Sequence, residues 1–295
     1  MAGAAAVVFA VFAVGAGAGA AATPVVVGPS ICHGVENWTV SFEDEFQGAS
    51  LNLSRWTVRD NMTHGSTEKQ LYVAHGVSVS GTGELLLTTR RERAKSAAGK
   101  LYNFTSGWVE SRGKAFQAGG RFEVRAKLPP AAAGRAGKWP TAWPAHWLMP
   151  EPSTSRPPNV CWPVGGEIDI MEAYRPANAN AGDGDGKNEE EDVVMTYHWA
   201  DACGHDLWTG QQGRFARPGA DWSDAFHTYA VEWLPGEKIT WFVDALPRYE
   251  VRKGTPEGLT VPEDPFYMIL NTALQSWADA GLDTGFPMTH AIDRV

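Results

Sequence analysis

The sequence lacks the features that several ligand classes require. It has three cysteines in 295 residues, and no CxxC or HxxxH spacing that would hold a metal ion. Basic residues are in the minority, with 25 Lys and Arg against 34 Asp and Glu and a formal net charge of −9. Because phosphate binding needs a basic face, this balance argues against a nucleic-acid partner and is compatible with a neutral substrate.

Convincing helical periodicity, internal repeats and an interdomain linker are also absent from the sequence. Short β-rich segments recur instead, with turn residues between them. Phe122, Val124 and Ala126 alternate with charged residues, as expected for a strand with one buried face. We therefore expect an all-β protein in which two antiparallel sheets pack face to face. The expected strands are 84–90, 120–128, 192–199, 227–234, 238–244 and 266–274.

A long apolar run occurs at the start of the chain. Residues 1–22 are rich in Ala and Gly, carry no charged side chain and end in small residues, which predicts a secretory signal peptide. An uncleaved anchor is the alternative, although the Gly and Ala content makes the run poorly apolar. Sequons at Asn37, Asn52, Asn61 and Asn103 fit an exported glycoprotein. We expect a secreted monomer with no stable membrane partner.

The cysteine count of three predicts one disulfide and one remaining thiol in an exported chain. We expect the disulfide to join Cys161 and Cys203, because both flank the acidic strand described below. Tryptophan is abundant, with 13 residues, which indicates a large aromatic core or a surface that stacks on flat ligands. Trp56, Trp233 and Trp241 lie in strand-like contexts and are expected in the core.

Two segments are predicted as loops. Residues 150–158 contain four prolines, which cannot continue a β-ladder. Residues 178–192 are Gly-rich and acidic, and we interpret them as a solvated insertion. A Ca²⁺ loop is the alternative, since Asp183 and Asp185 alternate with Gly, but a full EF-hand ligand set is missing. The chain ends at residues 291–295 in a pattern typical of the start of a strand, so we expect a truncated C-terminal strand; residues 23–295 are expected to form one domain.

An acidic strand lies at the centre of the sequence. Ile168 and Ile170 alternate with Glu167 and Asp169. Because successive side chains of a strand point to opposite faces, the isoleucines would enter the core while the two acids share the other face.

Glu172 breaks this alternation, because it follows Glu167 by five residues. On a regular strand its carboxylate would point into the core, where an unpaired charge is costly. One extra residue in a β-bulge would return Glu172 to the acidic face, and we predict this bulge around Met171. Three carboxylates would then share one exposed face.

Neighbouring carboxylates repel one another, so at least one pKa is raised. Glycoside hydrolysis needs two carboxyl groups with different pKa values, so that one is ionised while the other carries a proton for the leaving oxygen. A retaining enzyme holds these groups about 5–5.5 Å apart. Four strand steps span about 13 Å, so strand bending and inclined side chains must close the gap. A solvated acidic face or a Ca²⁺ site are the alternative interpretations of the acidic strand.

The segment GGEIDIMEAY at residues 165–174 closely resembles the Glu-x-Asp-x-x-Glu active-site strand of glycoside hydrolase family 16, in its laminarinase-type group. The resemblance extends over about residues 42–295 and implies a β-jelly-roll sandwich with a concave sheet that carries the substrate cleft. Other segments that resemble the family are 42–46, 51–56, 105–107, 120–129, 143–148, 161–163, 226–233 and 265–271.

The resemblance also implies roles for single residues. Glu167 would be the nucleophile and Glu172 the general acid/base of a retaining mechanism, with Asp169 tuning their protonation. For each cleft tryptophan the alternative is core packing, and for His198 a structural role. The candidate substrate-binding residues are Trp143, Trp147, Trp162, His198, Asn271 and Trp277.

The expected activity is endo-acting hydrolysis of β-1,3-glucosidic bonds in β-glucans such as laminarin, with no cofactor required. A structural Ca²⁺ ion would be compatible with the family, but the sequence shows no convincing ligand set. The alternatives are a non-catalytic β-glucan recognition protein, a transglycosylase, and a hydrolase of mixed-linkage glucan or algal galactan. Recognition relatives lack the catalytic acids that this chain has, and a sulfated galactan would favour a basic cleft. Long connections at 129–139 and 178–192 could reshape the subsites.

Overall fold

The computed structural model falls into two compact units, Met1–Ser41 and Phe42–Val295. In the first unit, β1 (Val26–Val27) and β2 (Trp38–Thr39) pair in antiparallel fashion. No helix in the described part of the chain is long and apolar enough to cross a membrane. The structure describes residues 26–27, 38–130, 134–135, 139–140, 142–154, 160–173, 193–207, 209, 214–215, 222–276, 278 and 285–295.

Several predictions from the sequence lie outside these ranges. They concern the signal peptide at 1–22, the sequon at Asn37, the thiol of Cys32, the acidic insertion at 178–192 and the cleft residue Trp277.

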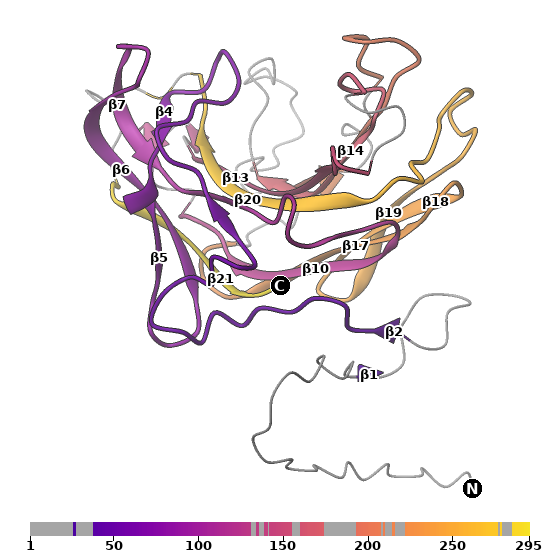
Figure 1. The fold of residues 1–295 in the computed structure, drawn as a ribbon, viewed down its shortest axis with the longest axis horizontal. Coiled ribbons are helices and arrows are strands. Elements are labelled where there is room, and N and C mark those ends of the chain that lie inside the picture. Colours follow the sequence, from indigo (N-terminus) through magenta and orange to yellow (C-terminus); the bar gives the residue numbers. More distant parts are fainter. Residues whose placement is uncertain are drawn as a thin grey trace, which may run out of the picture. The chain divides into compact units, whose positions relative to one another are not determined.

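Two sheets stack face to face in the unit Phe42–Val295 (Figure 1). The first, here called the cleft sheet, has the strand order β16-β15-β14-β13-β20-β8-β3, with β9 also paired to β20. Figure 1 shows this sheet as the upper, curved layer, with its concave side turned away from the second sheet. Its strands are β3 (Thr57–Val58), β8 (Trp108–Glu110), β9 (Phe116–Gln117), β13 (Ala142–Pro150), β14 (Glu167–Ala173), β15 (Val193–His198), β16 (Arg214–Phe215) and β20 (Phe266–Leu274).

The second sheet, here called the outer sheet, has the order β19-β18-β17-β10-β21-β6-β7-β4, with β5 also paired to β6. Its pairs are antiparallel except at the edge, where β4 and β7 run parallel. A 3₁₀-helix, η1 (Ala74–Gly76), follows β4, and β11 (Gly134–Arg135) pairs with β12 (Trp139–Pro140). The strands of the outer sheet are β4 (Gln70–Tyr72), β5 (Val77–Val79), β6 (Leu85–Lys95), β7 (Leu101–Ser106), β10 (Gly120–Lys127), β17 (His227–Leu234), β18 (Lys238–Val243), β19 (Leu246–Arg252) and β21 (Met288–Arg294).

The core lies between the two sheets, and it confirms the predicted all-β sandwich. Trp56, Trp233 and Trp241 are each 0% exposed, as predicted from their strand contexts. Each of the six predicted strands is present, two of them with the expected bounds. These strands were recognisable because each is short and β-rich with turn residues on either side, and in β10 the burial of one face also imposes a period of two.

The last strand differs from the prediction, because β21 begins at Met288 rather than near residue 291. It lies between β10 and β6 in the outer sheet. The backbone of Val295 then exchanges two hydrogen bonds of 3.1 Å with Asp44.

Candidate active site

A β-bulge in β14 sets the direction of the acidic side chains. Against β13, Met171 is opposite His146 and Asp169 is opposite Trp147, which leaves Ile170 without an opposite residue. The register against β15 shifts over the same stretch. The predicted bulge is therefore confirmed, but its extra residue is Ile170 rather than Met171.

The bulge turns two consecutive apolar residues toward the core. Ile168, Ile170 and Met171 all belong to the core cluster between the sheets. Since both bulge residues face inward, Glu172 returns to the face of Glu167, as the cost of burying an unpaired carboxylate requires. This face is more enclosed than predicted, because Asp169 is only 2% exposed.

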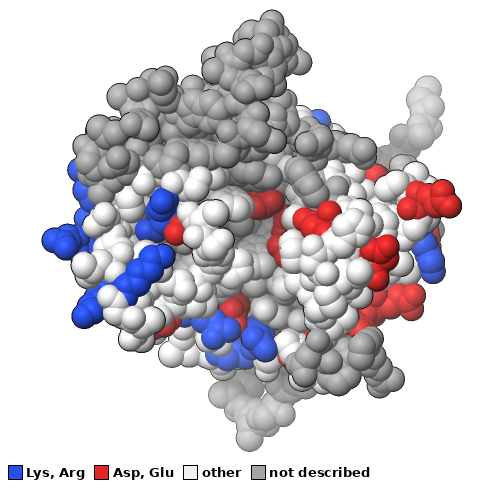
Figure 2. Space-filling view, turned by 90° about the horizontal axis from the view of Figure 1, so that it is seen from above, with Lys and Arg blue, Asp and Glu red and all other residues white. Residues whose placement is uncertain are grey.

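Each outer acid accepts a hydrogen bond from an indole. Trp162 Nε1 donates to Glu167 Oε2 at 2.5 Å, and Trp143 Nε1 donates to Glu172 Oε1 at 2.8 Å. Viewed from above the cleft sheet, acidic side chains line a hollow in the surface (Figure 2).

Burial and mutual repulsion raise the pKa values of the outer acids. Burial raises the pKa of Glu172 most, Asp169 raises it further, and His198 and Trp143 partly oppose them, giving about 8. Burial and the Asp169 charge likewise raise the pKa of Glu167 well above its ordinary value, while His198 and Trp162 favour its ionised form. A carboxyl that keeps its proton at neutral pH can act as an acid.

His198 faces the acids from the neighbouring strand, directly opposite Glu167. Its Nε2 lies 3.2 Å from Asp169 Oδ2, and its Nδ1 lies 2.9 Å from Asp206 Oδ2. Burial alone would lower the pKa of His198, but its contacts with Asp169 and Asp206 and the charge of Glu167 raise it to about 11.

Glu167, Asp169 and His198 have donor atoms within 4.8 Å of one another, a spacing that could hold a metal ion. A metal ligand must be a neutral imidazole with a free lone pair. Each nitrogen of His198 faces a carboxylate, and this arrangement favours the imidazolium over the neutral ring. The chemistry of this donor set therefore fits proton transfer better than metal binding.

The predicted substrate-binding residues differ in their exposure. Trp162 is 45% exposed, and its ring centroid lies 5.7 Å from that of His198. Trp147 is 7% exposed, and its ring packs against Trp108 and His64 at centroid distances of 5.4 and 5.6 Å. Trp162 thus offers a ring face beside the acids, whereas the rings around Trp147 cover much of its surface.

A hydrogen-bond chain runs from Trp147 across the cleft sheet. Trp147 Nε1 donates to Asn271 Oδ1 at 2.8 Å, Asn271 Nδ2 donates to the Tyr72 hydroxyl at 2.9 Å, and that hydroxyl donates to Glu68 Oε2 at 3.1 Å. Asn271 is 5% exposed. Because an indole can only donate, the chain fixes which way the Asn271 amide points. Glu68 and Tyr72 were not predicted from the sequence, since they belong to no recognisable motif.

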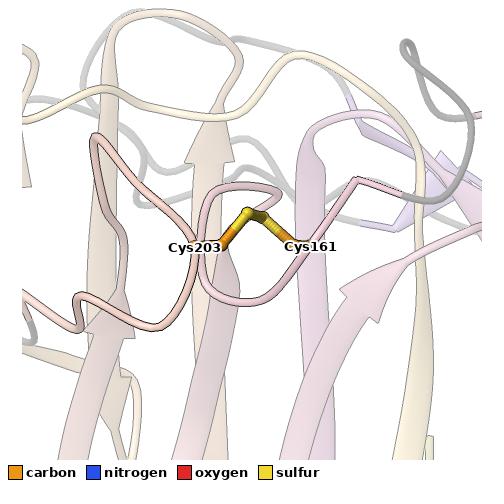
Figure 3. The surroundings of a disulfide bond; sticks show 2 residues. All are labelled: Cys161 and Cys203. Atoms are coloured by element: carbon orange, nitrogen blue, oxygen red, sulfur yellow. A yellow bond between two sulfur atoms is a disulfide. The ribbon is translucent and has the colours of Figure 1, made fainter.

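The predicted Cys161–Cys203 disulfide is present (Figure 3). It joins the segment before β14 to the segment after β15, and Gly204 N also donates to Trp162 O at 3.1 Å. Trp162 adjoins Cys161, and Asp206 follows Cys203 by three residues. The disulfide thus holds a neighbour of Glu167 and a neighbour of His198 in one cross-linked segment. Asp206 was not singled out from the sequence, although the expected disulfide already placed its loop beside the acidic strand.

A concave β-sandwich face with clustered carboxylates whose pKa values are raised is the arrangement that glycoside hydrolysis uses. The family model described as glycosyl hydrolases family 16 matches residues 69–285. The chain belongs to this family.

Several known proteins are similar to the chain. A "Beta-glucanase" from Rhodothermus marinus is 32% identical over an alignment of 278 residues, and the match covers 88% of this chain and 84% of that protein. A "Glucan endo-1,3-beta-glucosidase" from Cryptopygus antarcticus is 30% identical over 220 residues, 73% of this chain and 69% of that protein. The solved catalytic domain of an endo-1,3-beta-glucanase (laminarinase) from Thermotoga petrophila RKU-1 has a TM-score of 0.68 and 26% identity, and the match covers 88% of this chain and 97% of that one.

Proposed function

We propose that the enzyme is an endo-acting, retaining hydrolase of β-1,3-glucosidic bonds in glucans such as laminarin. The observation that carries the proposal is the placement of Glu167, Asp169 and Glu172 on one enclosed face of the cleft sheet. The activities named for the Rhodothermus and Cryptopygus relatives support a β-glucan substrate and a β-1,3 linkage respectively.

In the first step Glu172 acts as the acid. With a pKa of about 8 it is protonated at neutral pH and can give its proton to the glycosidic oxygen. The Glu167 carboxylate attacks the anomeric carbon from the opposite side as the bond to the leaving sugar breaks. The Trp162 N–H and the charge of His198 favour the ionised form of Glu167 that this attack needs. The product is a glycosyl ester on Glu167 and a free chain end.

In the second step Glu172, now ionised, removes a proton from water. The water oxygen attacks the anomeric carbon, the ester bond to Glu167 breaks, and Glu172 is protonated again. Two displacements at the same carbon retain its configuration. If a sugar hydroxyl replaces water here, the same residues transfer the chain instead of hydrolysing the bond.

Asp169 lies between the two outer acids and contacts His198. Its charge raises the pKa of both Glu167 and Glu172. We assign it the role of keeping the acid protonated, while His198 limits the repulsion on the nucleophile. Asp169 therefore links the protonation states of the two reacting groups.

The exposed indole of Trp162 is the best-placed sugar platform, because it borders Glu167 and presents an apolar face to the concave side. Trp143 would contact the sugar on the side of Glu172, because its indole is hydrogen-bonded to that carboxylate. Trp147 and Asn271 would form the floor under the chain, held in place by the contacts with Tyr72 and Trp108.

The test is release of reducing ends from laminarin by the purified protein, beside a Glu167→Gln variant. Barley mixed-linkage glucan, agarose and carrageenan are run in parallel. Release from laminarin that disappears in the variant and persists in EDTA supports the proposal, because the mechanism uses side chains alone. Laminarin that is bound but never cleaved would favour a recognition protein, whereas cleavage of another polymer only would reassign the substrate.

Export remains a proposal that rests on the leader sequence and on the disulfide, which is typical of oxidising compartments. Among the described sequons, the amide of Asn52 accepts hydrogen bonds from Ser54 and that of Asn61 is engaged with the backbone of Lys95 and Ala97, whereas Asn103 is exposed on β7. Asn103 is therefore the better acceptor for a glycan. Mass spectrometry of secreted protein would show the cleaved leader and the modified asparagine; an intact leader on cell-associated protein would overturn this assignment.

A further inference from the structure

His198 is held between two carboxylates that come from different parts of the chain. On one side its Nε2 lies 3.2 Å from Asp169 Oδ2, on β14. On the other side its Nδ1 lies 3.0 and 2.9 Å from the two carboxylate oxygens of Asp206, in the segment after β15. The imidazole ring is mostly buried between them. The arrangement is a line of acid, base and acid that ends at the catalytic strand.

The geometry around the ring favours its protonated form. A neutral imidazole has one N–H and can donate to one acceptor only, whereas an imidazolium donates from both nitrogens. Among the described residues, the charged groups that act on the ring include Asp169, Glu167 and Glu172 on the acidic strand and Asp206 in the segment after β15. The exposed ring of Trp162 covers a further side. Since all these charged neighbours are acids, the site favours the imidazolium.

We propose that Asp206 is a positioning residue for the glycosidase reaction, which holds the His198 ring charged and aligned between Asp169 and the nucleophile Glu167. The proposal rests on the function proposed above. A fixed positive charge at this point offsets repulsion among the clustered acids and favours an ionised Glu167. Without Asp206, the ring loses its second carboxylate and can release its proton, so that Glu167 would keep its own proton to a higher pH.

The fold gives Asp206 a fixed place for this role. The segment is anchored by the Cys161–Cys203 disulfide. In addition, the N–H of Leu207, which follows Asp206, donates at 2.9 Å to the carbonyl oxygen of Trp199, which follows His198. A second pair in the same segment, His205 Nδ1 with Asp201 Oδ1 at 2.9 Å, lies at the surface and contacts none of the catalytic acids in the described structure. Asp201 is therefore a matched control of the same chemistry.

The first measurement is an NMR titration of the His198 ring nitrogens between about pH 5 and pH 9, which reports the protonation of the ring. In the native protein the ring is expected to remain an imidazolium, and in Asp206→Asn it is expected to titrate within this range. The Asn side chain keeps the size and an acceptor oxygen but removes the charge. A ring that is already neutral at pH 7 in the native protein would overturn the proposal.

The second measurement is the pH profile of kcat on the polymer that the native enzyme cleaves. Asp206→Asn is expected to move the acidic limb to higher pH by about one unit or more, since it removes support for ionised Glu167. Asp206→Glu should largely restore the limb, and Asp201→Asn should leave it unchanged. Melting temperatures of all variants identify any loss of folding. A loss of kcat that is equal at every pH, or that Asp201→Asn reproduces, would overturn the proposal.

The two failures can be told apart. If no polysaccharide is cleaved, the proposed function fails, while the NMR titration still decides whether Asp206 holds His198 charged. If cleavage occurs but the ring titrates normally in the native protein, the function stands and the role of Asp206 falls.

Discussion

Trp143 Nε1 donates to Glu172 Oε1 at 2.8 Å, so that one indole supports the carboxylate form of the group that must act as the acid. Burial and Asp169 raise the pKa of Glu172 to about 8, and this hydrogen bond opposes them. Glu167 has its own indole partner, Trp162, from the segment before β14. The two acids can therefore be perturbed one at a time, by removing one donor at a time.

Trp143→Phe is expected to move the basic limb of kcat/KM to higher pH, because Glu172 without its donor keeps its proton longer. The shift should be up to about one unit. The matched variant Trp162→Phe should instead move the acidic limb to higher pH, because the ionised form of Glu167 loses its donor. The measurement is the pH profile of initial rates on laminarin. A shift of the same limb in both variants would contradict the separate assignments.

Glu172→Gln is expected to slow hydrolysis of laminarin by about 10²–10⁴-fold, the usual contribution of a general acid or base. An aryl laminaribioside with a good leaving group should form the glycosyl-enzyme nearly as fast as before, because its departure needs no proton. Added azide should then restore turnover, since it attacks without a base, and the product should be the β-glycosyl azide. Equal losses on both substrates, with no azide effect, would remove Glu172 from the acid/base role.

The sequence predicts most of the fold because the buried strands are short β-rich segments with turn residues between them. The strands β17 and β20 could be bounded correctly from their β-rich composition and the turn residues that flank them, although β20 is buried at every position and shows no alternation of burial. The bulge in β14 could be inferred from the cost of burying Glu172. Its extra residue could not be assigned, because Ile170 and Met171 are both apolar and both face the core.

The site could be predicted only in part. The acids and their roles came from spacing and from the family resemblance. Asp206 lies in the segment after β15, and Glu68 and Tyr72 lie before and at the end of β4. They reach the cleft residues only through the fold, and such contacts have no local sequence pattern. A tryptophan suits both a core and a sugar platform, so the exposure of Trp162 and the burial of Trp147 had to come from the structure.

A buried histidine pair predicts acid sensitivity of the fold. His146 Nε2 and His290 Nε2 lie 3.0 Å apart between the sheets, and both rings are 0% exposed. Burial lowers the pKa of His146 well below its ordinary value of 6.5 and that of His290 to about 3. Below pH 6.5 these two histidines bind protons in the unfolded chain, whereas their buried rings stay neutral in the folded chain. Their contribution to the free energy of unfolding is therefore fully present above this pH and is lost as the pH decreases.

The double variant His146→Leu/His290→Leu should lose this acid sensitivity. At about pH 4.5 each neutral ring costs up to about 3 kcal/mol of unfolding free energy relative to neutral pH. The difference in melting temperature between about pH 7.5 and 4.5 should thus be smaller in the double variant. His75→Asn, at an exposed histidine, is the control and should keep the native difference. An unchanged difference in the double variant would place the acid sensitivity elsewhere.

Removal of the disulfide is expected to reduce stability and activity together. The bond closes a sequence separation of 42 residues, for which chain entropy gives about 4 kcal/mol of stabilisation. The variant Cys161→Ser/Cys203→Ser should therefore unfold at lower denaturant concentration, and its KM should rise because Trp162 is no longer fixed beside Glu167. Cys32→Ser is the control. A native KM in the double variant would show that the disulfide does not position the cleft.

The most direct test of the account is to trap the covalent intermediate. A 2-deoxy-2-fluoro laminaribioside with a dinitrophenolate leaving group should inactivate the enzyme, because fluorine slows both steps and the good leaving group speeds only the first. Mass spectrometry of the digested protein should then find one disaccharide attached to Glu167. A label on Asp169 or Glu172, or turnover of laminarin with inverted configuration at the new chain end, would contradict the mechanism.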